Sequence, residues 1–277
     1  MNEARSLVKT ASQWTIGFIL TIALILFLVV LVAAQVTSGG AGQRALRRAV
    51  AATTDIDAAL PGIEEALHKA AAEGSADHVT VPDYPIPVEL PRSQAATVAG
   101  AGLRDALLME SGRRLYDDGW STWDDLDAEG RQDVRTISTA GLLKRGLGLI
   151  DGANHRIFLG LTVALGLLVL GLAASRAVSL TAYSRLVALG SALTAAALPL
   201  LAGAVAVRFG FRTAAVDADP FAKGLLDLGV SIMAVAIRTY VILSLLGLAV
   251  ALVGAGFLWW EARTASRRSP DLPAPMP

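Results

Sequence analysis

The sequence predicts an all-α integral membrane protein with four transmembrane helices, a mostly helical extracytoplasmic domain between the first two spans, and an outward extension of the fourth span. Composition is the first reason: 54% of the 277 residues are hydrophobic and only 17% are charged, whereas soluble domains are usually about a quarter charged. The second reason is that the apolar residues are concentrated in four long runs. Each run can cross a bilayer core of about 30 Å as a helix that rises about 1.5 Å per residue.

The four predicted spans are residues 14–34, 157–174, 186–207 and 239–260, and none contains Asp, Glu, Lys, Arg or His. The first run has a second interpretation as a secretory signal peptide, because small residues at 32–34 precede Gln35. A signal core is usually about 7–15 residues long. The greater length of this run favours an uncleaved anchor.

Basic residues in short segments predict the orientation. Lys and Arg occur in residues 1–13, in the turn 175–185 and in the tail 261–277. Because short cytoplasmic loops carry an excess of Lys and Arg, both termini and the turn are predicted to be cytoplasmic. Residues 35–156 and 208–238 are then extracytoplasmic. Abundant Ala, Gly, Leu and Arg are associated with high-GC bacterial genomes, so we expect a bacterial plasma membrane.

The large hydrophilic region, residues 35–156, is predicted to be mostly helical. Residues 43–73 repeat Ala and Leu among charged residues, which indicates a helix interrupted at Pro61 and Gly62. Residues 79–91 contain four prolines, which exclude a helix or a central strand and predict an extended connection.

Two more helices are predicted before the second span. Ser93 is expected to cap one of them, which continues to about Asp117 and is ended by Gly119. Apolar residues from Gln132 onward suggest another helix that leads into the second span.

The region 208–238 is predicted to begin as a short loop and then to become helical. Asp219 followed by Pro220 fits an N-cap and the first position of a helix. A helix unbroken from Pro220 through the span 239–260 would be about 60 Å long. Its first half is then expected outside the membrane, packed on the domain of residues 35–156.

No motif in the sequence points firmly to a metal, a cofactor or a catalytic centre. Acidic residues from Asp125 resemble the start of a calcium-binding loop, but its twelfth position is Thr136 rather than Glu, and helix capping explains these acids as well. The histidines His68, His78 and His155 are far apart, with no ligand spacing. We therefore expect neither a cofactor nor an enzymatic activity.

Aromatic residues and one arginine are candidate contacts with a partner. Trp120 and Trp123, with Tyr116, form the densest aromatic cluster outside the spans. They could make a partner surface, although filling a small core or resting at the lipid interface is more common. Arg238 lies about 16 Å from Asp227 along a helix, which is too far for pairing. Contact with lipid phosphate or the outer surface is favoured over a buried role.

Small residues four apart in the last two spans predict close helix packing. The spacing does not decide between packing inside one bundle and packing between subunits. The candidates are Ala188, Ala192 and Ala196 in the third span, and Gly247, Ala251 and Ala255 in the fourth.

The function that these features favour is a non-enzymatic assembly or accessory subunit, which presents its extracytoplasmic domain to partner or identical subunits. The lipid bilayer and other membrane subunits are the expected partners. Nucleic acid is not expected, because 24 basic and 24 acidic residues balance. An oligomeric pore and an extracytoplasmic sensor that acts through a membrane partner are the alternatives. Spans without ionisable residues argue against an ion-coupled transporter.

Overall fold

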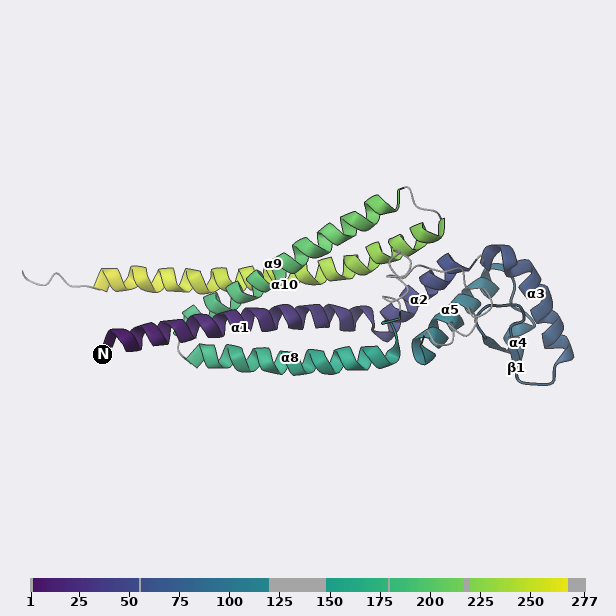
Figure 1. The fold of residues 1–277 in the computed structure, drawn as a ribbon, viewed down its shortest axis with the longest axis horizontal. Helices are drawn as coiled ribbons and strands as arrows, with labels where there is room; N and C mark the ends of the chain where they lie inside the picture. Colours follow the sequence, from purple (N-terminus) through teal and green to yellow (C-terminus); the bar gives the residue numbers. More distant parts are fainter. Residues whose placement is uncertain (1, 55, 120–147, 179, 217–219, 269–277) are drawn as a thin grey trace, which may run out of the picture. The chain divides into compact units, whose positions relative to one another are not determined.

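The computed structural model describes residues 2–54, 56–119, 148–178, 180–216 and 220–268. Most of them are helical (Figure 1). The chain divides into two compact units. The span unit is Met1–Val32, Gly160–Ala206 and Ala236–Pro277, and the globular unit is Ala33–Leu159 and Val207–Val235.

Four helices are long and apolar enough to cross a membrane. They are α1 (Asn2–Val36), α8 (Gly152–Val178), α9 (Ala182–Ala214) and α10 (Pro220–Arg268). Each predicted span lies inside one of them, so the prediction of a helical, membrane-type protein is confirmed. The helix α10 begins at Pro220, as the sequence predicted, and its 49 residues continue beyond the predicted span to Arg268; Asp219 lies outside the described residues.

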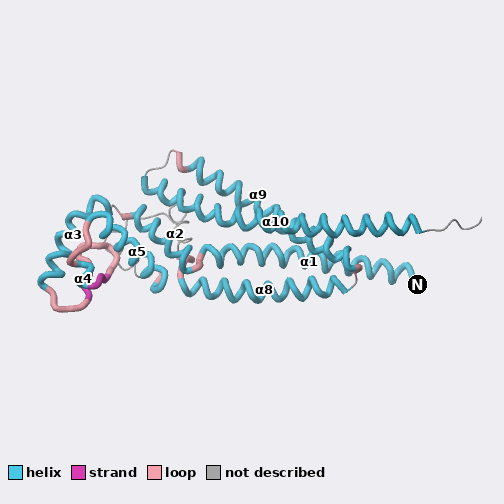
Figure 2. The backbone as a smooth tube through the Cα atoms, turned by 180° about the vertical axis from the view of Figure 1, so that it is seen from behind, coloured by secondary structure: helices cyan, strands magenta, loops and turns pink. Residues whose placement is uncertain are grey.

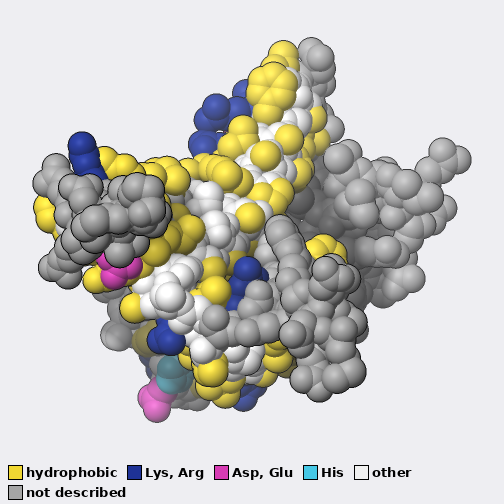
Figure 3. Space-filling view, turned by 90° about the vertical axis from the view of Figure 1, so that its left-hand side faces the viewer, with side chains coloured by type: hydrophobic (Ala, Val, Ile, Leu, Met, Phe, Trp, Pro, Cys, Tyr) yellow, Lys and Arg dark blue, Asp and Glu magenta, His cyan; other side chains and the backbone are white. Residues whose placement is uncertain are grey.

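The surface of the span helices is apolar, as contact with lipid requires. None of the described residues of α8 is buried, and leucines on α8 and α10 are exposed, such as Leu170 at 66% and Leu252 at 62%. Figure 3 shows hydrophobic side chains over much of one face. Because a soluble protein rarely exposes so many neighbouring apolar side chains, these surfaces suit a hydrocarbon environment.

Small residues let α9 and α10 cross closely within the span unit. A methyl group added to Gly190 would lie 2.5 Å from both the Ala251 nitrogen and the Gly247 carbonyl oxygen. The rings of Tyr183 and Phe257 stack with their centroids 4.9 Å apart. The two helices therefore approach backbone to backbone at this point.

The globular unit has one hydrophobic core, to which six short elements contribute. They are α2 (Gly39–Thr53), α3 (Ile56–Glu73), β1 (His78–Thr80), β2 (Glu89–Pro91), α4 (Arg92–Ala95) and α5 (Gly100–Asp118). Figure 2 shows the strands among the surrounding helices. Leu228 of α10 is 2% exposed and belongs to the same core, so the first part of α10 is a structural element of this unit.

Two predicted helix boundaries in the globular unit are corrected. Pro61 lies inside α3, and the chain breaks at Thr54, whose backbone is extended. Pro61 is tolerated because it is exposed in the second turn of α3, where water can bind the Asp57 carbonyl group that loses its partner. Ser93 is not a cap, because it lies inside the short helix α4, and Ala99 precedes α5.

The proline-rich segment forms a small hairpin instead of an extended connection alone. Strands β1 and β2 pair antiparallel, with Val79 opposite Leu90. The hairpin is compatible with proline because Pro91 is the last residue of a two-stranded sheet. Tyr84 within the segment is buried, and its hydroxyl lies 3.0 Å from the hydroxyl of Ser111 on α5.

The end of α5 agrees with the sequence. Gly119 follows Asp118 with φ at 78°, a conformation that favours glycine, and its N–H donates to the Leu115 carbonyl. The helix predicted from Gln132 lies outside the described residues.

Candidate functional site

Three arginines gather on one side of α2. This helix buries Leu46 and Val50 in the core of the globular unit. Arg44 lies three residues before Arg47 and four residues before Arg48, so it neighbours both of them on the helix surface. Arg44 and Arg48 are exposed, whereas Arg47 is half-buried. Burial of the apolar side of α2 thus presents the arginines on the other side.

A glycine on α5 allows α2 to approach closely beside these arginines. A methyl group on Gly112 would lie 2.5 Å from Cγ of Arg47 and 2.9 Å from the Gln43 carbonyl oxygen. The stem of Arg47 therefore packs directly on α5. Opposite the arginines, α5 buries Leu103 and Leu107 completely, so both helices are held by the same core.

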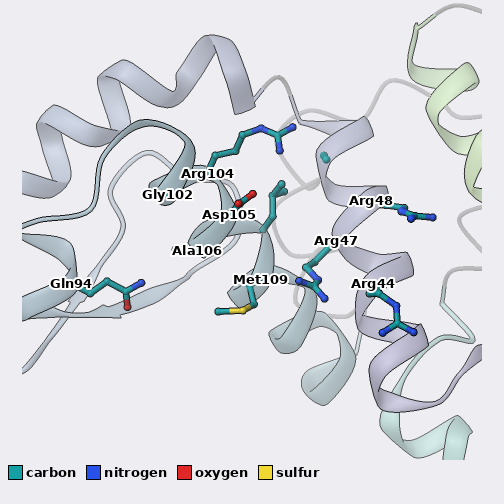
Figure 4. Close-up of a pocket in the computed structure, with 11 residues that line it drawn as sticks. Arg44, Arg47, Arg48, Gln94, Gly102, Arg104, Asp105, Ala106 and Met109 are labelled. Carbon is teal, nitrogen blue, oxygen red and sulfur yellow. The ribbon is translucent and has the colours of Figure 1, made fainter.

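An open cavity of about 820 Å³ lies between these two helices. Figure 4 shows the three arginines projecting from α2, with Arg104 and Met109 on α5. The remaining lining residues are small, apolar or uncharged, apart from one acid: Ala51, Gln94, Gly102, Asp105, Ala106 and Leu108.

The cavity carries an excess of positive charge. Arg104 is paired, because its Nε donates to Asp57 at 2.7 Å, and this hydrogen bond raises the pKa of Arg104 above its usual value. Within the described parts of the chain, no carboxylate lies within ion-pair distance of Arg44, Arg47 or Arg48. Asp105 is the one carboxylate in the lining. Two positive charges therefore remain uncompensated there.

A second cavity, of about 480 Å³, lies on another side of α5 and is internally paired. Arg113 binds Glu110 and lies 3.7 Å from Asp117. Arg114 lies 3.5 Å from Asp118 and also donates to the Pro87 carbonyl. These i, i+3 and i, i+4 pairs stabilise α5. The lining has four carboxylates and two arginines, so its excess of negative charge does not attract an anion.

Tyr116, a predicted partner contact, is a buried structural residue that joins α5 to the end of α1. It is 7% exposed, and its hydroxyl donates to the Thr37 carbonyl at 2.9 Å. Burial is the main reason that the pKa of Tyr116 is raised. Thr37 in turn lies 3.4 Å from Nδ1 of His155 near the start of α8. The hydroxyl of Thr37 donates to the Ala33 carbonyl, so the imidazole is placed to donate to it.

The other predicted contacts are Trp120, Trp123 and Arg238. Trp120, Trp123 and the acidic stretch from Asp125 lie outside the described residues. Arg238 is exposed on α10, in the span unit.

The histidines are separated, and two of them bind backbone or hydroxyl groups. His68 donates through Nε2 to the Val98 carbonyl at 3.1 Å. His78 lines the second cavity, and His155 contacts Thr37. In the described ranges, no group of three metal-ligating side chains lies together.

The predicted small residues are distributed unequally around the α9–α10 crossing. Gly247 and Ala251 lie at its closest point, opposite Gly190. Ala192 and Ala196 are buried, Ala188 is half-buried and Ala255 is exposed.

Sequence reasoning missed Gly190, Gly254 and the α2 arginines. A methyl group on Gly254 would lie 2.8 Å from Cβ of Leu186. Gly190 and Thr194 are small residues four positions apart on α9, and this spacing could have identified Gly190 as a packing residue. In the sequence, the α2 arginines were only charges on a helix. Their cavity is lined by α5 as well as α2, so the sequence of α2 alone could not reveal it.

Comparison with known proteins found no matching family model, no similar curated protein and no similar solved structure.

Proposed function

We propose that this chain is a non-enzymatic accessory or assembly subunit of a bacterial plasma membrane. In this proposal four helices anchor the chain, and the globular unit binds a partner or an identical subunit on the extracytoplasmic side. The observation that carries the proposal is the positively charged cavity between α2 and α5. A packed unit with an open, uncompensated charged cavity is suited to recognition.

The distribution of packing supports a binding role for the globular unit. Its core contains residues fully withdrawn from solvent, such as Leu46, Leu67 and Leu107. The cavity is thus built on helices that a core holds in place, and rigid support of this kind favours specific binding. The basic segments 1–13 and 175–185 support the orientation, because they favour the cytoplasmic side.

A sensor that acts through a membrane partner is the second candidate, and one observation favours it. The hydrogen bond from Tyr116 to Thr37, and the contact of Thr37 with His155, connect α5 to the end of α1 and the start of α8. A ligand that displaced α5 would therefore act on two membrane-crossing helices at once.

Site-specific photo-crosslinking in intact membranes tests the assembly role. Met109 lines the cavity and is 56% exposed, so a photoreactive residue there should crosslink to one defined polypeptide. A photoreactive residue at Thr181, in the predicted cytoplasmic turn, is the matched control and should not capture the same polypeptide.

Mass measurement in native lipid completes the test. The proposal expects a particle heavier than one 28.8 kDa chain, composed either of copies of the chain or of the chain and the crosslinked partner. A single chain without a crosslinked partner would contradict it. A ring of copies that conducts ions would favour the pore instead.

A further inference from the structure

We propose that the cavity between α2 and α5 binds a phosphate group through Arg44, Arg47 and Arg48. This inference rests on the proposed role of the globular unit as a binding domain, and it names the chemistry that the unit recognises.

The three arginines of α2 have no ion-pair partner among the described residues. Like charges three and four residues apart on a helix repel one another. Other arginines of the same unit are compensated: Arg104 in the same cavity and Arg113 outside it each lie against a carboxylate. An anion bound beside α2 would relieve the repulsion and supply the missing partner.

One of the three arginines is held in place before a ligand binds. Arg47 packs against Gly112, so its stem is fixed between the two helices. Arg44 and Arg48 are exposed and one turn apart, and in Figure 4 they project from the side of α2 away from Arg47. Their long side chains must therefore rotate toward Arg47 to contact a ligand that it binds. Of the three, Arg47 loses the least freedom when it binds, because its stem is already held.

The chemistry of the lining favours phosphate among anions. Guanidinium groups present a planar fork of donors that matches the oxygens of phosphate, and the cavity lining contains four arginines and no lysine. Two uncompensated positive charges match a phosphate monoester, which carries about −1.5 to −2 charges at neutral pH. A ligand with a single carboxylate would leave one of the two positive charges uncompensated.

The size of the cavity allows the phosphate to be part of a larger molecule. A volume of about 820 Å³ lies within the roughly 300–1,000 Å³ of ligand pockets. Met109 and Leu108 offer apolar contact for the remainder of that molecule. The arginines follow Val36, the last residue of the membrane-type helix α1, within about twelve residues. The phosphate of a lipid headgroup is therefore one source of this chemistry, and a soluble phosphate compound is the other.

Binding of soluble phosphate is tested by titration calorimetry of the full-length protein in a maltoside detergent, which carries no phosphate. The probes are inorganic phosphate and pyrophosphate. We expect saturable binding that Arg47→Gln weakens roughly tenfold. Replacement of all three α2 arginines by Gln should weaken it at least about a hundredfold. Arg47→Lys, which keeps the charge but loses the fork, should give an intermediate affinity.

The matched control is Arg113→Gln on α5. It removes the same charge from the same unit but belongs to the paired cluster around Glu110, so phosphate binding should remain as in the unaltered protein. Should the triple variant fail to fold by circular dichroism, the single variants Arg44→Gln and Arg48→Gln, at exposed positions, decide the question.

A second measurement distinguishes the two sources of phosphate. Native mass spectrometry should show retention of phosphatidylglycerol over diacylglycerol if the source is a lipid headgroup, and the α2 variants should remove this preference. Binding of the soluble probes without retention of phosphatidylglycerol identifies a soluble ligand.

Three results would overturn the inference: no saturable binding in either measurement, unchanged binding by the triple variant, or an equal loss in Arg113→Gln. Failure of the assembly role is distinct from these. If phosphate binds but Met109 crosslinks to nothing, the phosphate site stands and the assembly role falls. The reverse result removes the phosphate site alone.

Discussion

Substitution of Gly190 by Ala tests whether α9 and α10 meet backbone to backbone. The added methyl group would lie 2.5 Å from the Ala251 nitrogen and the Gly247 carbonyl oxygen, whereas ordinary contacts begin near 3.4 Å. The helices must therefore separate by about 0.9 Å at this point. Neither backbone atom can rotate away, so overpacking should lower the free energy of unfolding by about 1–3 kcal/mol.

The matched control is Gly203→Ala on the same helix, where nothing lies within 4 Å of the added methyl group. Because Ala favours a helix by up to about 1 kcal/mol over Gly, this variant should be neutral or slightly more stable. Unfolding by sodium dodecyl sulfate in mixed micelles, followed by circular dichroism, gives both free energies. Equal effects of the two substitutions would refute the close crossing.

Three further predictions concern the globular unit. Gly112→Ala places a methyl group 2.5 Å from Cγ of Arg47 and should lower the midpoint of thermal unfolding, with a loss of about 1–3 kcal/mol; Gly102→Ala, whose nearest contact is 3.5 Å, should not. Tyr116→Phe removes the bond to Thr37 and should cost about 1 kcal/mol in chemical unfolding; a loss indistinguishable from zero would mean that the bond does not stabilise the junction. Burial raises the pKa of Tyr84 in the folded protein, so the folded state keeps its proton longer than the unfolded state, and stability should fall as the pH rises above about 10. Tyr84→Phe should reduce this slope in thermal unfolding between about pH 9 and 11, and an unchanged slope would assign it to other groups.

Long apolar runs and helix start or stop signals could be predicted from the sequence, because each depends on neighbouring residues alone. The spans, the start of α10 at Pro220 and the end of α5 at Gly119 are of this kind. Pro61 shows the limit of local reasoning. Proline is a strong breaker, yet its early and exposed position in α3 made it tolerable, and the break fell at Thr54.

The candidate site could not be predicted because it depends on contacts between residues distant in the sequence. Arg47 meets Gly112 about 65 residues later in the chain. On α2 alone, the arginines had the ordinary appearance of a solvated helix face. The role proposed for them follows from the cavity that α5 forms beside them, and from the absence of an ion pair to these arginines among the described residues.

Labelling of single cysteines in intact cells tests the central claim, that the globular unit is held on the outer side of the membrane. The chain contains no cysteine, so each introduced thiol is unique. Met109→Cys, at an exposed position in the cavity, should react with a membrane-impermeant maleimide, whereas Thr181→Cys should react only after permeabilisation. Labelling of Thr181→Cys but not Met109→Cys in intact cells would contradict the account.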